Sequence, residues 1–257
     1  MSVLRSRDNP RVKRWAKLVH DSRFRGEEQR TLIEGPHLLG ALLERGLKPL
    51  ALLATEAALA DGEMAELARH AALQPVLLSE AVFRSIADAE TPPGIAAEIA
   101  IPQLEPARSV QSVFLEGVQD PANVGAIIRS AAAFAAGSVV VDRACADPWS
   151  PKALRAGMGG HFRLALRQVE DLWETLERYP GKSIATVARD GVPLDGADLR
   201  EQPGWIFGAE GRGVSTKLQQ KAGFLVTIPM AEGAESLNVA AAAAICLHAA
   251  FQAKGDR

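Results

Sequence analysis

The sequence is poor in the residues that enzymes most often use for metal binding and nucleophilic catalysis. Its 257 residues include two cysteines, Cys145 and Cys246, which are far apart and form neither a metal-ligand spacing nor a disulfide framework. The five histidines are scattered, and none lies in a nucleophile elbow or a zinc motif. The pattern therefore favours chemistry without metal, cysteine or histidine, and it indicates a reduced, cytoplasmic protein.

Long apolar runs and targeting signals are also missing. No run approaches the roughly 20 residues that cross a bilayer, so no membrane segment is expected. The basic N-terminus is not followed by the apolar core of a signal peptide. A hydrophobic content of 47% and a charged content of 23% are typical of a globular chain, which is long enough for one large or two small domains.

Charge is unevenly distributed along this near-neutral chain, whose formal net charge is −2. The first 30 residues contain nine basic and four acidic side chains. Such a basic region indicates a polyanionic partner whose affinity falls as salt rises. A solvated amphipathic helix is the alternative on charge alone.

Residues 1–101 alternate helical and strand-like segments, which predicts a small α/β domain. The proline-containing stretch from 102 to 111 has few periodic apolar positions and is expected to be a linker. Residues 112–257 then alternate continuous apolar strands with helices. This pattern predicts a mainly parallel sheet covered on both faces, which binds ligands at the carboxyl ends of its strands.

The first expected strand end runs into DPANVGAIIRSA, where Asn123 is a plausible helix N-cap. Residues four apart stack on one helix face, so Gly125, Arg129 and the alanines at 132 and 133 share a stripe with little bulk. A wide ligand could lie on this bare face while the Arg129 guanidinium binds a phosphate. The alternative is an exposed arginine beside a helix that packs tightly on another helix.

Two further strand ends have the same character. GAEGRGVS contains three glycines around Glu210, and such residues let a backbone bend sharply or approach a flat ligand. Its spacing matches neither a phosphate loop nor a dinucleotide fingerprint, and many such turns are structural. In IPMAEGAESLN, Ser236 could serve only as the N-cap of the terminal helix, with Asn238 in its first turn.

Together these segments resemble the motifs of the SpoU (TrmH-type) RNA 2′-O-ribose methyltransferases, within the knotted SPOUT class. DPANVGAIIRSA matches the first motif, GAEGRGVS the second, and IPMAEGAESLNVAAAAAI the third, in the family's order over about 150 residues. SPKALRAGMGGHFRL is similar to the segment between the first two motifs, with Arg155 at its arginine. Ala240 departs from the pattern, because a serine is frequent there.

The resemblance implies a trefoil knot in the C-terminal domain, a homodimer and S-adenosylmethionine as methyl donor. The donor would be bound largely by main-chain groups, without a metal. Residues matching the family's donor site are Gly208, Ala209, Gly213, Ile228, Met230, Ser236 and Leu237. Those matching its catalytic positions are Asn123, Arg129, Glu210, Ser236 and Asn238.

The N-terminal part is similar to the ribosomal-protein-like substrate-binding domain often joined to such enzymes. This similarity favours ribosomal RNA over transfer RNA as the substrate. A non-catalytic RNA-binding assembly factor with the same fold is a further alternative, and the intact motif residues argue against it. The residues expected to contact RNA are basic and comprise Arg5, Arg11, Lys13, Arg14, Arg25, Arg129 and Arg155.

Overall fold

The computed structural model describes residues 3–107, 111–201 and 203–255, so part of the expected linker, 108–110, lies outside the described residues. Contacts divide the chain into two compact units. The first contains Met1–Pro102 together with Asp147–Phe162, and the second contains Gln103–Ala146 and Arg163–Arg257. By contacts, Asp147–Phe162 groups with the first unit, whereas the boundaries 1–101 and 112–257 stay predictions from the sequence.

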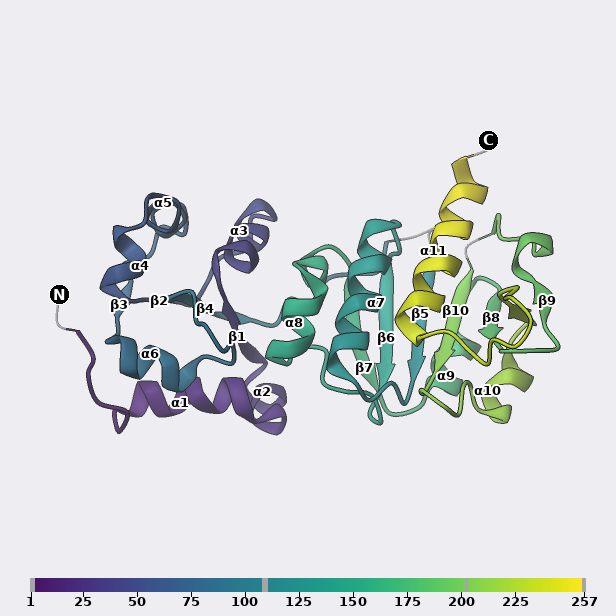
Figure 1. Cartoon of the computed structure of the whole chain (residues 1–257), viewed down its shortest axis with the longest axis horizontal. Coiled ribbons are helices and arrows are strands. Elements are labelled where there is room, and N and C mark those ends of the chain that lie inside the picture. The colour runs from purple at the N-terminus through teal and green to yellow at the C-terminus, as the bar shows by residue number, and fades with distance from the viewer. Residues whose placement is uncertain (1–2, 108–110, 202, 256–257) are drawn as a thin grey trace. The chain divides into compact units, whose positions relative to one another are not determined.

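The first unit is built on a mixed four-stranded sheet with the order β1-β4-β2-β3. Strand β4 pairs antiparallel with β1 and β2, whereas β2 and β3 are parallel. Figure 1 shows α1 and α6 on one side of this sheet and α3, α4 and α5 on the other. The strands are β1 (Arg30–Glu34), β2 (Ala51–Ala54), β3 (Val76–Leu77) and β4 (Ile95–Ala100). The helices are α1 (Pro10–His20), α2 (Ser22–Glu28), α3 (Pro36–Glu44), α4 (Glu56–Ala60), α5 (Gly62–His70) and α6 (Glu80–Ile86).

The segment Asp147–Phe162 carries α8 (Pro151–Gly157) and the short helix η1 (Gly160–Phe162). Within the first unit, α8 contacts β1, and the Thr31 hydroxyl donates a hydrogen bond to the Trp149 carbonyl at 3.0 Å. The Arg45 guanidinium donates to the Phe162 carbonyl at 3.3 Å. These polar contacts, together with buried apolar side chains of α8, explain why the segment packs with residues distant in sequence.

The second unit has one sheet whose seven described strands pair in parallel, in the order β7-β6-β5-β10-β8-β11-β9. This sheet confirms the predicted α/β fold. The strands are β5 (Ser112–Glu116), β6 (Ser138–Asp142), β7 (Ala165–Val169), β8 (Ser183–Thr186), β9 (Val192–Pro193), β10 (Gly204–Gly208) and β11 (Phe224–Thr227). The helices are α7 (Pro121–Ala133), α9 (Leu172–Glu177), η2 (Leu194–Gly196), α10 (Thr216–Lys221) and α11 (Val239–Gly255).

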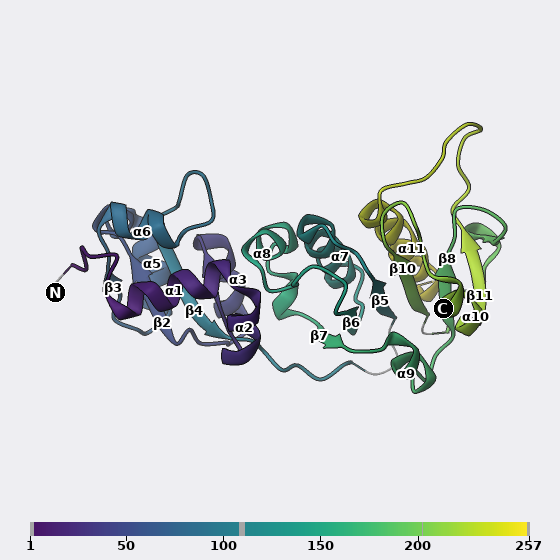
Figure 2. The ribbon, with the colours of Figure 1, turned by 90° about the horizontal axis from the view of Figure 1, so that it is seen from below.

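Helices cover both faces of this parallel sheet, as buried continuous apolar strands require. Helices α7 and α11 pack against each other in front of the sheet in Figure 1, and Figure 2 shows α9 on the opposite side. Strand β10 is buried along its whole length between β5 and β8. The loops that follow β5, β10 and β11 therefore share the carboxyl edge of the sheet. The trefoil knot stays a prediction of the resemblance.

Two expected helix starts are shifted. Helix α7 begins at Pro121, and the Asp120 carboxylate, not Asn123, accepts the capping hydrogen bond from the Ala122 amide at 3.0 Å. Helix α11 begins at Val239, so Ser236 lies before it and Asn238 provides the cap. Among the described residues, no helix combines the length and apolar character needed to span a membrane.

Candidate active site

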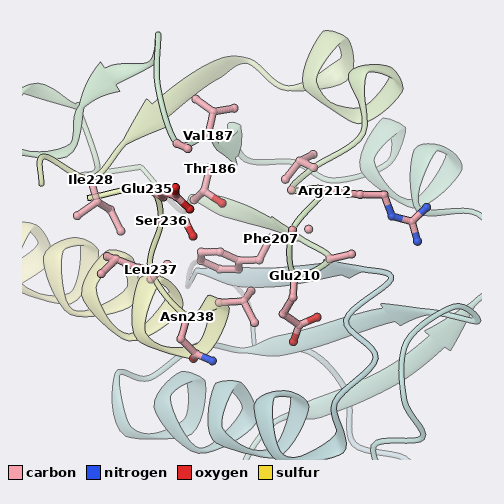
Figure 3. A pocket seen from close by; sticks show the side chains of 18 of the residues that line it. Thr186, Val187, Phe207, Glu210, Arg212, Ile228, Glu235, Ser236, Leu237 and Asn238 are labelled. Carbon is pink, nitrogen blue, oxygen red and sulfur yellow. The ribbon is translucent and has the colours of Figure 1, made fainter. Parts of the chain in front are cut away.

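A cavity of about 650 Å³ lies at the carboxyl edge of the second unit's sheet. Its walls come from the ends of β8 and β10 and from the loop between β11 and α11, as Figure 3 shows. Every residue predicted for the donor site lines this cavity: Gly208, Ala209, Gly213, Ile228, Met230, Ser236 and Leu237. The cavity thus joins the second and third motif segments, which are separated in sequence by α10 and β11.

The wall after β10 is a tight loop of residues 208–214, the glycine loop, which folds back over the end of its own strand. The Gly213 amide donates to the Ala209 carbonyl at 2.8 Å, and these two residues form an isolated β-bridge. A Cβ atom at Gly208 would lie 2.0 Å from the Gly213 carbonyl carbon. Gly208 is therefore required by the loop's own backbone, whereas Gly211 and Gly213 supply the positive φ angles of 80° and 67°.

A chain of side-chain hydrogen bonds joins all three motif segments at the rim of the cavity. The Asn238 amide donates to the Asn123 side-chain oxygen at 3.1 Å, and the Asn123 amide donates to the Glu210 carboxylate at 2.6 Å. The Asn238 oxygen accepts from the Ala240 and Ala241 amides at 2.9 and 3.3 Å, so it also caps α11. In Figure 3 Asn238 and Glu210 lie on the same side of the cavity. The carboxylate is the terminal acceptor of this chain.

Arg129 lies on α7 but does not line the cavity. Its side chain is exposed and has no hydrogen bond or ion pair among the described residues. Part of the face with little bulk is covered, because Gly125 is buried inside the unit and α7 packs against the alanine-rich α11. Ala133, one helical turn beyond Arg129, is exposed. Arg129 is therefore a cation that the described residues leave available to a ligand.

Of the basic residues expected to contact RNA, those of the N-terminus and α1 are the most accessible. Arg5, Arg11 and Lys13 are exposed, and the Arg11 guanidinium lies 5.0 Å from the Trp15 ring centroid. Arg14 is half-buried and forms 2.8 Å ion pairs with Glu28 and Glu98.

Two arginines expected to contact RNA form ion pairs within the first unit. Arg25 is 4% exposed, with its guanidinium bound to Asp147 at 2.6 Å and to the Leu18 and Val19 carbonyls at the end of α1. Burial with all these partners argues against contact between Arg25 and RNA. Arg155 is half-buried and pairs with Asp88 at 2.6 Å within the first unit. Sequence alone could not reveal these ion pairs, because the partners are far away in the chain.

The cysteines and the buried histidine are unsuited to catalysis. Burial raises the pKa of the Cys145 and Cys246 thiols to about 12, which disfavours the reactive thiolate. Burial also lowers the pKa of His161 to about 4, and its Nε2 lies 2.8 Å from the Pro148 carbonyl. Among the described residues, no group of three His, Cys, Asp or Glu side chains could hold a metal.

Comparison with known proteins decides the family. Residues 111–248 match the model of the SpoU rRNA Methylase family, and residues 9–97 match an MRM3-like substrate binding domain. The chain belongs to the SpoU family. Membership confirms the predicted activity, an RNA 2′-O-ribose methyltransferase that uses S-adenosylmethionine.

Similarity extends over nearly the whole chain. The chain is 32% identical over 250 residues to the 23S rRNA (guanosine(2553)-2′-O)-methyltransferase RlmP of Bacillus subtilis, covering 96% of this chain and 98% of that protein. The crystal structure of AviRb from Streptomyces viridochromogenes with AdoMet matches with a TM-score of 0.86 and 25% identity, covering 95% and 97% of the chains. AdoMet-bound rRNA methyltransferase from Sinorhizobium meliloti matches with a TM-score of 0.82 and 27% identity, covering 98% and 97%.

The cavity suits S-adenosylmethionine in size and chemistry. Ligand cavities typically measure about 300–1,000 Å³ and have mostly apolar walls with a few polar groups. Here Phe207, Ile228 and Leu237 provide apolar surface, and the glycine loop presents main-chain groups at the opening. Thr186, Val187 and Ala188 form a further wall of the cavity and were not among the predicted donor-site residues. These residues follow strand β8, so the rule that parallel sheets bind ligands at carboxyl ends could have found them.

Proposed function

We propose that this protein methylates a ribose 2′-hydroxyl of ribosomal RNA, with the donor in the 650 Å³ cavity of the second unit. The observation that carries the proposal is the hydrogen-bond chain from Asn238 through Asn123 to Glu210 at the cavity rim. It unites three motif segments beside the donor cavity. Similarity over the whole chain to a protein named as a 23S rRNA methyltransferase supports ribosomal RNA, and with it a cytoplasmic location.

The chemistry requires alignment of a weak nucleophile and removal of its proton. Bound S-adenosylmethionine supplies an electrophilic methyl group. Both side-chain ends of Asn238 and of Asn123 are engaged in the rim network, so these residues hold the loops in place. The Ser236 hydroxyl has no hydrogen bond among the described residues, lines the cavity and is available to orient the ribose. Glu210 orders the network by accepting from Asn123.

Arg129 holds a phosphate next to the target ribose in this proposal. A guanidinium remains protonated in proteins and binds phosphate through two parallel hydrogen bonds, so it suits a clamp better than a base. The clamped phosphate can in turn accept the ribose proton. The exposed, unpaired state of Arg129 among the described residues supports this role.

The functional form is a homodimer. As the family resemblance implies, an arginine of one subunit helps to complete the active site of the other. Helix α11 is composed mainly of alanine and other apolar residues, which is typical of a helix that is largely buried. Yet Ile245 and Phe251 are 41% and 46% exposed in the single chain. Phe134 lies beside this apolar surface, with its ring centroid 6.1 Å from that of Phe251. A second copy of the chain is the occupant that symmetry favours for such a surface.

The first unit supplies RNA affinity through the exposed cations Arg5, Arg11 and Lys13 and the half-buried Arg14. Match of residues 9–97 to a substrate binding domain supports this role. Such contacts bind phosphates without reading sequence.

The test is to incubate the protein with methyl-labelled donor and either unmodified ribosomal RNA or transfer RNA, and then to map the blocked ribose. We expect label at a 2′-hydroxyl of ribosomal RNA. Label in transfer RNA alone would contradict the substrate class. Donor binding without methylation of either RNA would favour the assembly-factor alternative.

A further inference from the structure

Glu116, the last residue of β5, touches both ends of the glycine loop. In the β5–β10 ladder its backbone is the register partner of Gly208, where the loop begins. Its carboxylate Oε2 accepts a hydrogen bond from the Ser215 amide at 2.7 Å, where the loop ends and α10 starts. Glu116 precedes the first motif segment, which begins at Asp120, and nothing in the sequence pattern signalled a contact with the second.

The segment between these two anchors is short and flexible by composition. Residues 209–214 include Gly211 and Gly213 at positive φ, and glycines lose more conformational freedom on ordering than other residues. The same segment lines the cavity and carries Glu210 at the rim network. Fixing the end of the loop therefore fixes both a cavity wall and the carboxylate that accepts from Asn123.

We propose that Glu116 is a positioning residue, which pre-organises the glycine loop for the methyl donor by accepting the Ser215 amide. This hydrogen bond is half-buried at the sheet edge, where its loss leaves the Ser215 amide without this acceptor. Without it, donor binding has to order the loop, and affinity falls by that cost. The inference rests on the proposed donor site.

Three substitutions separate the effect of side-chain length at Glu116 from the effect of its charge. Glu116→Gln keeps an oxygen at the same distance but removes the charge, Glu116→Asp keeps the charge but shortens the side chain, and Glu116→Ala removes both. Glu174 on α9 is the matched control, because its exposed carboxylate has no hydrogen bond or ion pair among the described residues. The measurements are calorimetric affinity for S-adenosylmethionine and amide hydrogen exchange of residues 209–215 in the free, full-length protein.

We expect Glu116→Gln to bind the donor within roughly threefold of the wild type, because it keeps an acceptor for the Ser215 amide. Glu116→Asp and Glu116→Ala should bind about tenfold more weakly, as loss of this hydrogen bond predicts. Exchange of 209–215 should speed up in the Asp and Ala variants and stay slow in Glu174→Ala. Thermal midpoints identify any variant that fails to fold. The comparison of Glu116→Gln with Glu116→Asp then decides whether the hydrogen bond to the Ser215 amide positions the loop.

Equal affinity and exchange in all Glu116 variants would overturn the inference. So would wild-type behaviour of Glu116→Asp with a defect in Glu116→Gln, because charge and not the hydrogen bond would then matter. If the wild type itself bound no donor, the proposed donor site would fail. Exchange in the free protein would still decide whether Glu116 anchors the loop.

Discussion

A buried charge cluster in the first unit contrasts with an exposed polar network in the second. In the first unit the buried Glu98 carboxylate accepts from Arg14, Arg30 and the Trp15 indole, and Arg25 is buried against Asp147. In the second unit the polar residues at the cavity rim stay exposed, as Glu210, Ser236 and Asn238 do. A basic residue in the first unit is thus often committed to the fold, whereas the second unit leaves polar groups accessible to ligands.

This contrast changes how charge in the sequence should be interpreted. Counting cations identified a polyanion-binding region but gave Arg25 and Arg5 equal weight. Burial and partners separate them, because a guanidinium that already has an ion pair and carbonyl acceptors cannot bind a phosphate without breaking these contacts. The predictions below test that separation, from the largest expected effect to the smallest.

Arg25→Ala should destabilise the protein by about 3–5 kcal/mol, the usual cost of removing one partner of a buried ion pair. The change removes the guanidinium from Asp147 Oδ2 and from the carbonyls at the end of α1, while the Trp149 amide still donates to Asp147 Oδ1. Denaturant unfolding followed by circular dichroism measures it. Arg23→Ala, at an 87% exposed side chain, is the control and should leave the midpoint unchanged. Equal midpoints for the two variants would remove the structural role of Arg25.

Arg129→Ala should lower methyl transfer roughly a hundredfold to a thousandfold, as removal of a preorganised charge-stabilising group does. The thermal midpoint should not change, because the side chain is exposed and has no partner among the described residues. Arg129→Lys should recover little activity, since lysine lacks the planar fork that binds phosphate. Wild-type turnover in the alanine variant would rule out the clamp.

Acid should destabilise the first unit through His161. Burial lowers its folded-state pKa to about 4, below the ordinary value of 6.5, so the unfolded chain binds the proton first as pH falls. The contribution of neutral His161 to the free energy of unfolding is fully present above pH 6.5. It is lost as pH falls towards 4, by about 3 kcal/mol in total. His161→Gln keeps a donor for the Pro148 carbonyl but cannot titrate, so its stability should vary less over this range. An equal pH dependence in both proteins would contradict the assignment.

Gly208→Ala should weaken donor binding about tenfold or more, because a Cβ there would meet the Gly213 backbone and displace the loop. Gly211→Ala is the comparison at the loop tip. A Cβ there has nothing within 4 Å, so only the positive φ angle opposes it, at a cost of about 1 kcal/mol. Calorimetry measures both affinities. A larger loss for Gly211→Ala than for Gly208→Ala would refute the backbone-packing account.

Neutralising Arg5, Arg11 and Lys13 together should have the smallest effect for each residue. Each phosphate contact that is lost should reduce the salt dependence of RNA affinity by about 0.7–0.9 in the log–log slope. Binding titrations at several salt concentrations measure the slope, and donor affinity serves as the internal control. An unchanged slope would show that these three residues do not contact RNA phosphates.

Local patterns predicted the parallel sheet and the three motif segments, because continuous apolar strands and loops of small residues can be recognised from residues that are adjacent in sequence. They missed the docking of Asp147–Phe162 on the first unit, since its partners Arg25, Thr31 and Arg45 are distant in sequence. The N-cap predicted for α7, Asn123, lies three residues after the observed cap, Asp120, because both residue types are good N-caps. The role of Gly208 needed coordinates, since the backbone that excludes its Cβ comes from five residues later.

The most direct measurement is a crystal structure of the full-length protein with S-adenosylhomocysteine, the demethylated form of the donor. Our account predicts ligand density between the glycine loop, 208–214, and the segment 228–238. The bonds from Asn238 to Asn123 and from Asn123 to Glu210 should remain in place. Density at another surface, or motif loops that point away from a ligand of measured affinity, would contradict the account.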